Sequence, residues 1–160
     1  MASASPAACG APALGRRDRP RHRAGAARVG LIYLDTCLLI YAFENHPVWG
    51  GRVREALARE SPERFAISSL VKFECLVAPM QSGNVALQRY YEQGFAQFAL
   101  LDMPDEVFLQ GAMLRARFGL KTPDALHLAT AMAHRCDALW TADQRLEQAA
   151  HGLALNILSD

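Results

Sequence analysis

The sequence lacks any apolar stretch as long as the roughly 18 residues that a membrane-spanning helix needs, so we expect no membrane anchor. It also lacks a C-x-x-C pair, and the spacing of its four cysteines fits neither a zinc site nor a disulfide framework. Three of them, Cys37, Cys75 and Cys136, lie in hydrophobic segments, and we expect buried free thiols. That cysteine usage favours a reducing cytoplasm as the compartment.

The chain as a whole has almost no excess charge, with a net of +1, but its charged residues are unevenly distributed. Residues 1–28 carry six arginines against one aspartate, a net of +5. Residues 29–160 carry 11 basic and 15 acidic residues, a net of −4. A nucleic-acid-binding domain is usually basic, so charge alone does not identify the folded part as one.

Residues 1–28 also contain almost no large apolar side chains. Such a segment cannot bury enough surface to offset its ordering entropy, so we expect a disordered basic tail. Three interpretations stay open: a dispensable tail from a start codon assigned too far upstream, a basic arm that contacts RNA phosphates, or an organelle transit peptide. A secretory signal is excluded because Arg16 and Arg17 precede more charge, not an apolar segment.

Residues 29–160 are long enough for one domain with a core, and their pattern alternates between strands and helices. This alternation predicts an α/β fold with a parallel five-stranded sheet and right-handed crossovers. The expected strands are residues 30–34, 65–67, 99–101, 138–140 and 153–157. The expected helices are residues 36–43, 49–60, 69–78, 84–95, 104–118, 122–134 and 143–148, with Pro79 ending the third and Thr122 capping the sixth.

Four carboxylates recur where a strand has just ended or in a helix that follows a strand. They are Asp35, Glu74, Asp124 and Asp143. Taken singly, each favours a structural role: Asp35 and Asp143 as helix N-caps, Glu74 on a solvated helix face, and Asp124 in a favourable first turn. Neighbouring Thr36 and Thr141 could take over capping or hydrogen bonding from the two N-cap candidates.

Taken together, the four acids indicate a metal site. The carboxyl ends of parallel strands meet at one edge of the sheet, where ligands bind. Carboxylates gathered there repel one another unless a cation lies between them. Magnesium prefers oxygen ligands, and one or two such ions can activate water and stabilise a leaving oxygen on a phosphodiester.

His127 lies three residues after Asp124 on the same helix face. It could orient that carboxylate, but the burial tendencies of histidine favour a packed or half-exposed core residue.

The chain resembles PIN-domain ribonucleases, most closely the VapC-type toxins of type II toxin–antitoxin pairs. The resemblance covers residues 29–160, and its most specific pieces are residues 32–44, Ile-Tyr-Leu-Asp-Thr-Cys-Leu-Leu-Ile-Tyr-Ala-Phe-Glu, and residues 121–131, Lys-Thr-Pro-Asp-Ala-Leu-His-Leu-Ala-Thr-Ala. Ser68 and Ser69 with Glu74, and Trp140 with Asp143, add weaker support. Cys37 stands where many relatives have Asn, and the basic tail has no counterpart in the family pattern.

The resemblance implies a PIN-like three-layer sandwich that binds Mg²⁺ or Mn²⁺. It implies Asp35 and Asp124 as the main metal ligands, with Glu74 and Asp143 completing the site and Thr36 and Thr141 orienting the acids. It also implies endonucleolytic cleavage of structured RNA, a homodimer, and a small antitoxin whose tail occupies a groove beside the site. The basic residues available for RNA are few: Lys72, Arg115, Arg117, Lys121 and Arg145.

Two other functions stay open at this stage. A PIN-fold binding module would hold an antitoxin or RNA with little or no turnover, although the complete set of four acids argues against it. A phosphatase or phosphotransferase with Asp35 as nucleophile would usually carry a second aspartate two residues later, where this chain has Cys37.

Overall fold

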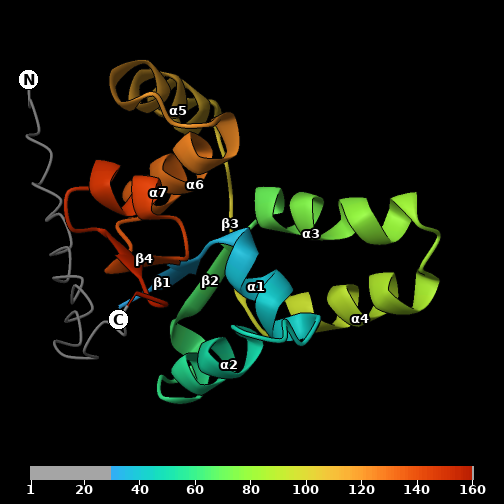
Figure 1. Ribbon diagram of the computed structural model, residues 1–160. Helices are drawn as coiled ribbons and strands as arrows, with labels where there is room; N and C mark the ends of the chain where they lie inside the picture. The colour runs from blue at the N-terminus through green and yellow to red at the C-terminus, as the bar shows by residue number, and fades with distance from the viewer. Residues whose placement is uncertain (1–29, 160) are drawn as a thin grey trace, which may run out of the picture.

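A computed structural model describes residues 30–159, which form a five-stranded sheet with helices on both faces (Figure 1). The strands are β1 (Ile32–Leu34), β2 (Phe65–Ser68), β3 (Ala99–Leu101), β4 (Ala138–Thr141) and β5 (Ala154–Asn156). The helices are α1 (Thr36–Phe43), α2 (Gly50–Ala58), α3 (Ser69–Gln81), α4 (Val85–Phe95), α5 (Asp105–Phe118), α6 (Thr122–Ala133) and α7 (Gln144–Ala149). The predicted basic tail, residues 1–28, lies outside the described residues.

All neighbouring strands are parallel, in the order β3-β2-β1-β4-β5, which confirms the predicted fold class. The central strands β1, β2 and β4 are buried along their whole length, whereas the edge strands β3 and β5 are partly exposed. Burial on both faces explains why the central strands read as continuous apolar runs and not as alternating ones.

The chain begins at the central strand and adds strands first toward one edge of the sheet and then toward the other. From β1 it moves through β2 to the edge strand β3, and the connecting helices α1 to α4 lie on one side of the sheet (Figure 1). It then returns to β4 and β5, and the helices α5 to α7 lie on the opposite side (Figure 1). Because the crossovers are right-handed, the change in strand direction moves the connecting helices to the other face of the sheet. The point where the strand order changes direction opens a crevice between the carboxyl ends of β1 and β4.

Two expectations about residues at helix ends are wrong. Helix α3 does not end at Pro79 but continues to Gln81, with Pro79 inside it. The proline removes only its own N–H, and the carbonyls before the helix end still find donors: the Ser82 hydroxyl donates to the carbonyls of Ala78 and Pro79. Thr122 is not the cap of α6, because Lys121 holds that position and the Thr122 hydroxyl accepts a hydrogen bond from Arg115.

No helix within residues 30–159 is both long and apolar enough to cross a bilayer.

Candidate functional site

The crevice between β1 and β4 brings together the four acids that the sequence singled out. Asp35 follows β1, Asp143 follows β4, Glu74 lies on α3, and Asp124 lies in the first turn of α6. All four line one open cavity of about 560 Å³, together with Thr36 and Cys37. The positions predicted from strand ends therefore meet at one edge of the sheet.

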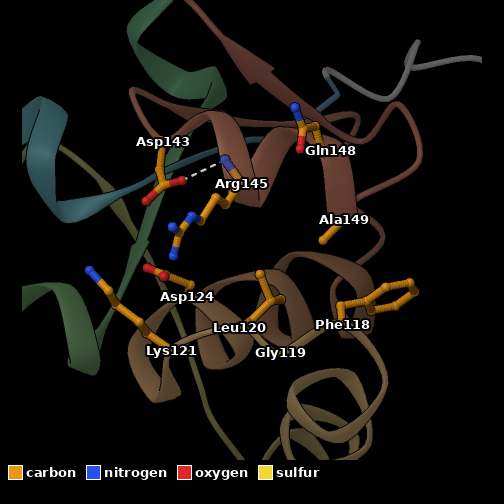
Figure 2. Close-up of a pocket in the computed structure, with 9 residues that line it drawn as sticks. All are labelled: Phe118, Gly119, Leu120, Lys121, Asp124, Asp143, Arg145, Gln148 and Ala149. Carbon is orange, nitrogen blue, oxygen red and sulfur yellow. Dashed lines mark hydrogen bonds between the residues drawn. The ribbon is translucent and has the colours of Figure 1, made fainter.

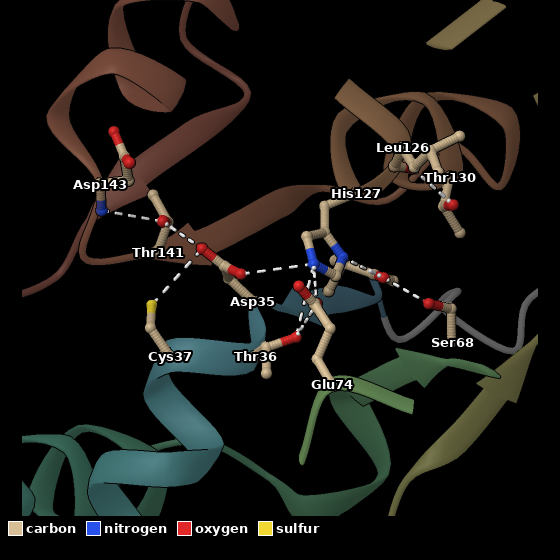
Figure 3. A network of polar contacts seen from close by, with 11 residues as sticks. Asp35, Thr36, Cys37, Ser68, Glu74, Leu126, His127, Thr130, Thr141 and Asp143 are labelled. Atoms are coloured by element: carbon tan, nitrogen blue, oxygen red, sulfur yellow. Dashed lines mark hydrogen bonds and ion pairs between the residues drawn. The ribbon is translucent and has the colours of Figure 1, made fainter. Parts of the chain in front are cut away.

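Asp35 is the most deeply buried of the four acids, with 6% of its surface exposed. Its Oδ2 accepts a 2.6 Å hydrogen bond from the Thr141 hydroxyl and a longer one from the Cys37 thiol (Figure 3). Its backbone N–H donates to the carbonyl of Trp140 on the neighbouring strand, at 3.0 Å. These contacts fix the carboxylate at the switch point. The resemblance implies that Thr141 orients the acids without saying which one, and its hydroxyl bonds to Asp35.

Asp35 occupies the N-cap position of α1, but its side chain makes no capping hydrogen bond. Thr36 does not take over the cap either, which contradicts that expectation. Its hydroxyl instead donates to Glu74 Oε2 at 2.6 Å. Both side chains of the Asp-Thr pair therefore point to the acid cluster and not to the helix backbone.

Glu74 is half-buried and takes a second hydrogen bond, at 2.8 Å, from Nε2 of His127. Burial alone would raise the pKa of this carboxyl, but the hydrogen bonds from His127 and Thr36 outweigh burial and hold the pKa below its usual value. Glu74 is therefore an ionised acid and not the solvated helix-face residue that its sequence position allowed.

His127 is the residue that sequence reasoning undervalued. Only 1% of its surface is exposed, and its Nε2 lies 2.8 Å from Glu74 and 3.6 Å from Asp35 Oδ1. Its other ring nitrogen, Nδ1, lies 2.9 Å from the buried Tyr33 hydroxyl, which in turn lies 2.6 Å from the Ser68 hydroxyl (Figure 3). Burial as a core residue was predicted, but this bridge between two acids was not.

Burial alone would lower the pKa of His127, but the bond to Glu74 and the charges of Asp35, Glu74 and Asp124 raise it. Within residues 30–159 no hydrogen bond or ion pair joins the ring to Asp124, the partner considered from the sequence. The available signal was a single histidine on an otherwise apolar face of α6, opposite a tyrosine in the first strand.

Asp124 differs from the other acids because its carboxylate accepts no hydrogen bond from any residue in the described part of the chain. Burial raises its pKa, and the negative charges of Asp35 and Asp143 raise it further, against smaller opposing effects of His127 and Lys121. Asp124 therefore carries a negative charge that the surrounding side chains leave largely uncompensated.

Asp143 is the N-cap of α7, so its structural interpretation is correct. Its Oδ1 accepts from the backbone N–H groups of Arg145, at 2.7 Å, and Leu146, at 3.2 Å. Its own N–H donates to Thr141 Oγ1 at 2.9 Å. Capping uses one carboxylate oxygen, which leaves the second available to the cavity.

The donor chemistry of the cavity fits a hard divalent cation. In residues 30–159 no three Asp, Glu, His or Cys side chains converge closely enough to enclose an ion. A tight cage is not required, however, because magnesium keeps several waters and is often held by only one or two carboxylates. The four acids share one cavity, and the charge of Asp124 within it is largely uncompensated, as a site for such an ion requires.

Comparisons with known proteins agree with this architecture. The sequence pattern of the PIN domain matches residues 32–152. A toxin–antitoxin complex from Klebsiella pneumoniae has a chain that is 23% identical, with a TM-score of 0.67 over 81% of this chain and 99% of that one. VapBC2 from Rickettsia felis, bound to a DNA fragment from its promoter, gives 19% identity and a TM-score of 0.63 over 78% and 97%.

A DNA-bound VapBC from Salmonella typhimurium gives 18% identity and a TM-score of 0.61, over 78% of this chain and 96% of that chain. These likenesses concern the fold. No curated protein matches the chain by sequence. Because the PIN pattern spans most of the chain, including all four acids, the chain belongs to the PIN-domain family.

Proposed function

We propose that this protein is a Mg²⁺- or Mn²⁺-dependent endoribonuclease, the toxin of a toxin–antitoxin pair. The observation that carries the proposal is the shared cavity of Asp35, Glu74, Asp124 and Asp143 at the switch point of the sheet. The pKa of Asp124 is raised, which indicates that the side chains around the cluster do not fully compensate its negative charge. Such a cluster is suited to a divalent cation and a phosphodiester.

In this proposal Asp35 and Asp124 hold the metal, Glu74 completes the site, and Asp143 contributes its free oxygen directly or through water. When bound, the metal would supply an activated water and stabilise the leaving 3′ oxygen. The protein's own contribution is orientation: Thr141 fixes Asp35, while Thr36 and His127 fix Glu74.

Exposed apolar side chains in two parts of the fold support protein partners. Phe73 and Met80 on α3 and Tyr90 on α4 are exposed, as are Leu109 and Met113 on α5. We infer that a small antitoxin and a second copy of the chain cover these side chains, since large exposed apolar patches usually mark interfaces. Light scattering of the purified chain, alone and with its antitoxin, tests both partners.

The nuclease is tested by induced expression in bacteria of the wild type, Asp35→Ala, Asp124→Ala and the control Glu55→Ala, an exposed acid on α2. We expect growth arrest and discrete new RNA fragments in the wild type and the control alone. If neither arrest nor fragments occur in any strain, and purified wild type with Mn²⁺ cuts no RNA, the nuclease proposal is wrong.

The metal is tested by thermal unfolding of Asp124→Asn with EDTA and with Mn²⁺. Burial and the charges of Asp35 and Asp143 raise the pKa of Asp124, which means that the charged carboxylate is disfavoured in the fold, so the neutral amide should raise the unfolding temperature of the metal-free protein. With Mn²⁺ the order should reverse, because only the wild type gains the binding free energy.

The alternative is a PIN-fold binding module with little turnover. It is favoured by the finding that no three potential ligands in residues 30–159 enclose an ion. Unchanged unfolding temperature of the wild type on addition of Mn²⁺ would support this module over the nuclease.

A further inference from the structure

A second cavity adjoins the acid cluster on the side of α6 and α7. It has a volume of about 390 Å³, and Asp124 and Asp143 line it as well as the first cavity. Its other walls come from the turn between α5 and α6 and from α7 (Figure 2). A cavity of this size lies in the range that holds a small organic ligand, about 300–1,000 Å³.

Two cations flank this cavity in a domain that is otherwise acidic. Lys121 stands at the N-cap of α6 and Arg145 in the first turn of α7, and both side chains are exposed. Figure 2 shows their charged ends on either side of the Asp124 carboxylate, with Lys121 pointing away from the wall that Leu120, Ala149 and Phe118 form. Within residues 30–159 neither forms a salt bridge, so both charges are available to an anionic ligand.

The rest of the lining is largely apolar. Leu120 and Ala149 are buried, and the half-buried ring of Phe118 has the guanidinium of Arg117 5.1 Å from its centre and makes an edge contact with the ring of His151. The cavity therefore combines two cations, the carboxylates of Asp124 and Asp143 and the amide of Gln148 with an apolar wall that includes an aromatic ring. A nucleotide offers the matching chemistry, an anionic phosphate and a flat base.

We propose that this cavity binds the nucleotide next to the scissile bond, with Lys121 and Arg145 on its phosphate and its base against the wall around Phe118. The inference rests on the proposed function, because the shared residues Asp124 and Asp143 put this nucleotide beside the metal site. A base stacked and paired in a duplex cannot enter such a cavity, so the substrate is unpaired at this position.

Binding is measured by fluorescence anisotropy on a twelve-nucleotide single-stranded RNA and on the same strand paired with its complement. Ca²⁺ replaces Mg²⁺, and the salt concentration is varied. The proteins are the wild type, Lys121→Ala/Arg145→Ala, Phe118→Leu and the control Arg89→Ala, which removes one exposed charge on α4. Arg59→Ala/Arg89→Ala matches the charge change of the double variant.

We expect the wild type to prefer the single strand. The double variant should lose roughly tenfold in affinity for it, and its plot of log affinity against log salt should become shallower by about 1 to 2. Phe118→Leu should weaken single-strand binding without changing that slope. Equal binding by the double variant and its charge-matched control, equal losses on single and paired RNA, or no binding by the wild type would each overturn the inference.

Cleavage, measured separately with Mn²⁺, distinguishes this inference from the proposed function. If the wild type cleaves RNA but the double variant binds and cleaves like its control, the nucleotide site is wrong and the nuclease stands. If the wild type does not cleave but the double variant loses single-strand binding selectively, the nuclease is wrong and the binding site stands. If both proposals are correct, the double variant raises KM more than it lowers kcat.

Discussion

At the scale of single residues, His127 connects more of the site than any acid does. Its ring contacts Tyr33 on β1, Thr36 on α1 and Glu74 on α3, so one imidazole joins three segments to its own helix α6. All these groups are buried or half-buried, and within residues 30–159 no buried side-chain polar atom lacks a hydrogen-bond partner. Removal of this ring should therefore lower the free energy of unfolding substantially.

We predict that His127→Ala lowers the free energy of unfolding by roughly 2–4 kcal/mol, because it removes packing and leaves Glu74 and Tyr33 each without one partner. His127→Gln should lose less, since its amide can still donate toward Glu74. Urea denaturation in EDTA measures both variants without interference from metal.

His134→Ala is the matched control, because His134 caps the same helix and its ring lies partly in solvent. Its loss should stay below about 1 kcal/mol. A loss for His127→Ala no larger than that of the control would mean that the ring only fills space.

The four acids were predictable from the sequence, and the partners of their neighbours were not. A carboxylate just past a buried strand can be located from local pattern, but Thr141 was considered only beside Asp143, and its bond to Asp35 on the neighbouring strand was not foreseen. The partners of His127 and Thr36 depend on how α3 and α6 meet across β1. That arrangement is set by tertiary packing, which no local pattern encodes.

At the scale of elements, α7 depends on an acid that also lines the cavity of the acid cluster. The helix spans only Gln144–Ala149, and the Asp143 carboxylate accepts hydrogen bonds from two backbone N–H groups in the first turn of α7. Short helices gain little from propensity alone, so this cap matters for the position of α7.

We predict that Asp143→Ala and Asp143→Asn separate the two roles. The Asn side chain can still accept the capping hydrogen bonds, so the free energy of unfolding of Asp143→Asn in EDTA should stay near that of the wild type. The free energy of unfolding of Asp143→Ala should be lower by about 1 kcal/mol. Both should reduce the stabilisation by Mn²⁺, which thermal unfolding at several Mn²⁺ concentrations measures. If Asn retains the full metal effect, Asp143 acts only as a helix cap.

Helix interiors were easier to predict than helix ends. Apolar periodicity located every α-helix. The roles of Pro79 as a helix end and Thr122 as an N-cap were predicted from the average preferences of proline and threonine. In the fold, α3 continues past Pro79 and the Ser82 hydroxyl donates to the carbonyls of Ala78 and Pro79 at its end, while Arg115 engages the Thr122 hydroxyl from the preceding helix. Each exception depends on one particular neighbour, which is why general preferences failed there.

At the scale of the whole molecule, the fold class followed from the alternation of strands and helices, but the strand order did not. The order β3-β2-β1-β4-β5 reverses direction at β1, and that reversal creates the crevice for the acids. With right-handed crossovers the reversal places α1 to α4 on one face and α5 to α7 on the other, and both layers pack on the same central strands. One core therefore serves both helical layers.

Two buried cysteines can report on this shared core, one on each side of the sheet. Cys75 lies on α3, and Cys136 lies between α6 and β4. Burial raises the pKa of Cys75 to about 12 and that of Cys136 to about 11. Only the thiolate reacts with iodoacetamide, so both should stay unlabelled in the native protein at pH 8.

We predict that urea makes both thiols reactive at the same midpoint, because unfolding exposes them and returns their pKa to about 8.5. Peptide mapping by mass spectrometry after brief labelling measures each site separately, and circular dichroism supplies the global transition. Raising the pH from 7 to 9 should speed labelling of the unfolded chain and leave the native protein almost unlabelled. If Cys136 reacted at markedly lower urea than Cys75, α5 to α7 would open while α1 to α4 stayed folded, and the two layers would not share one cooperative core.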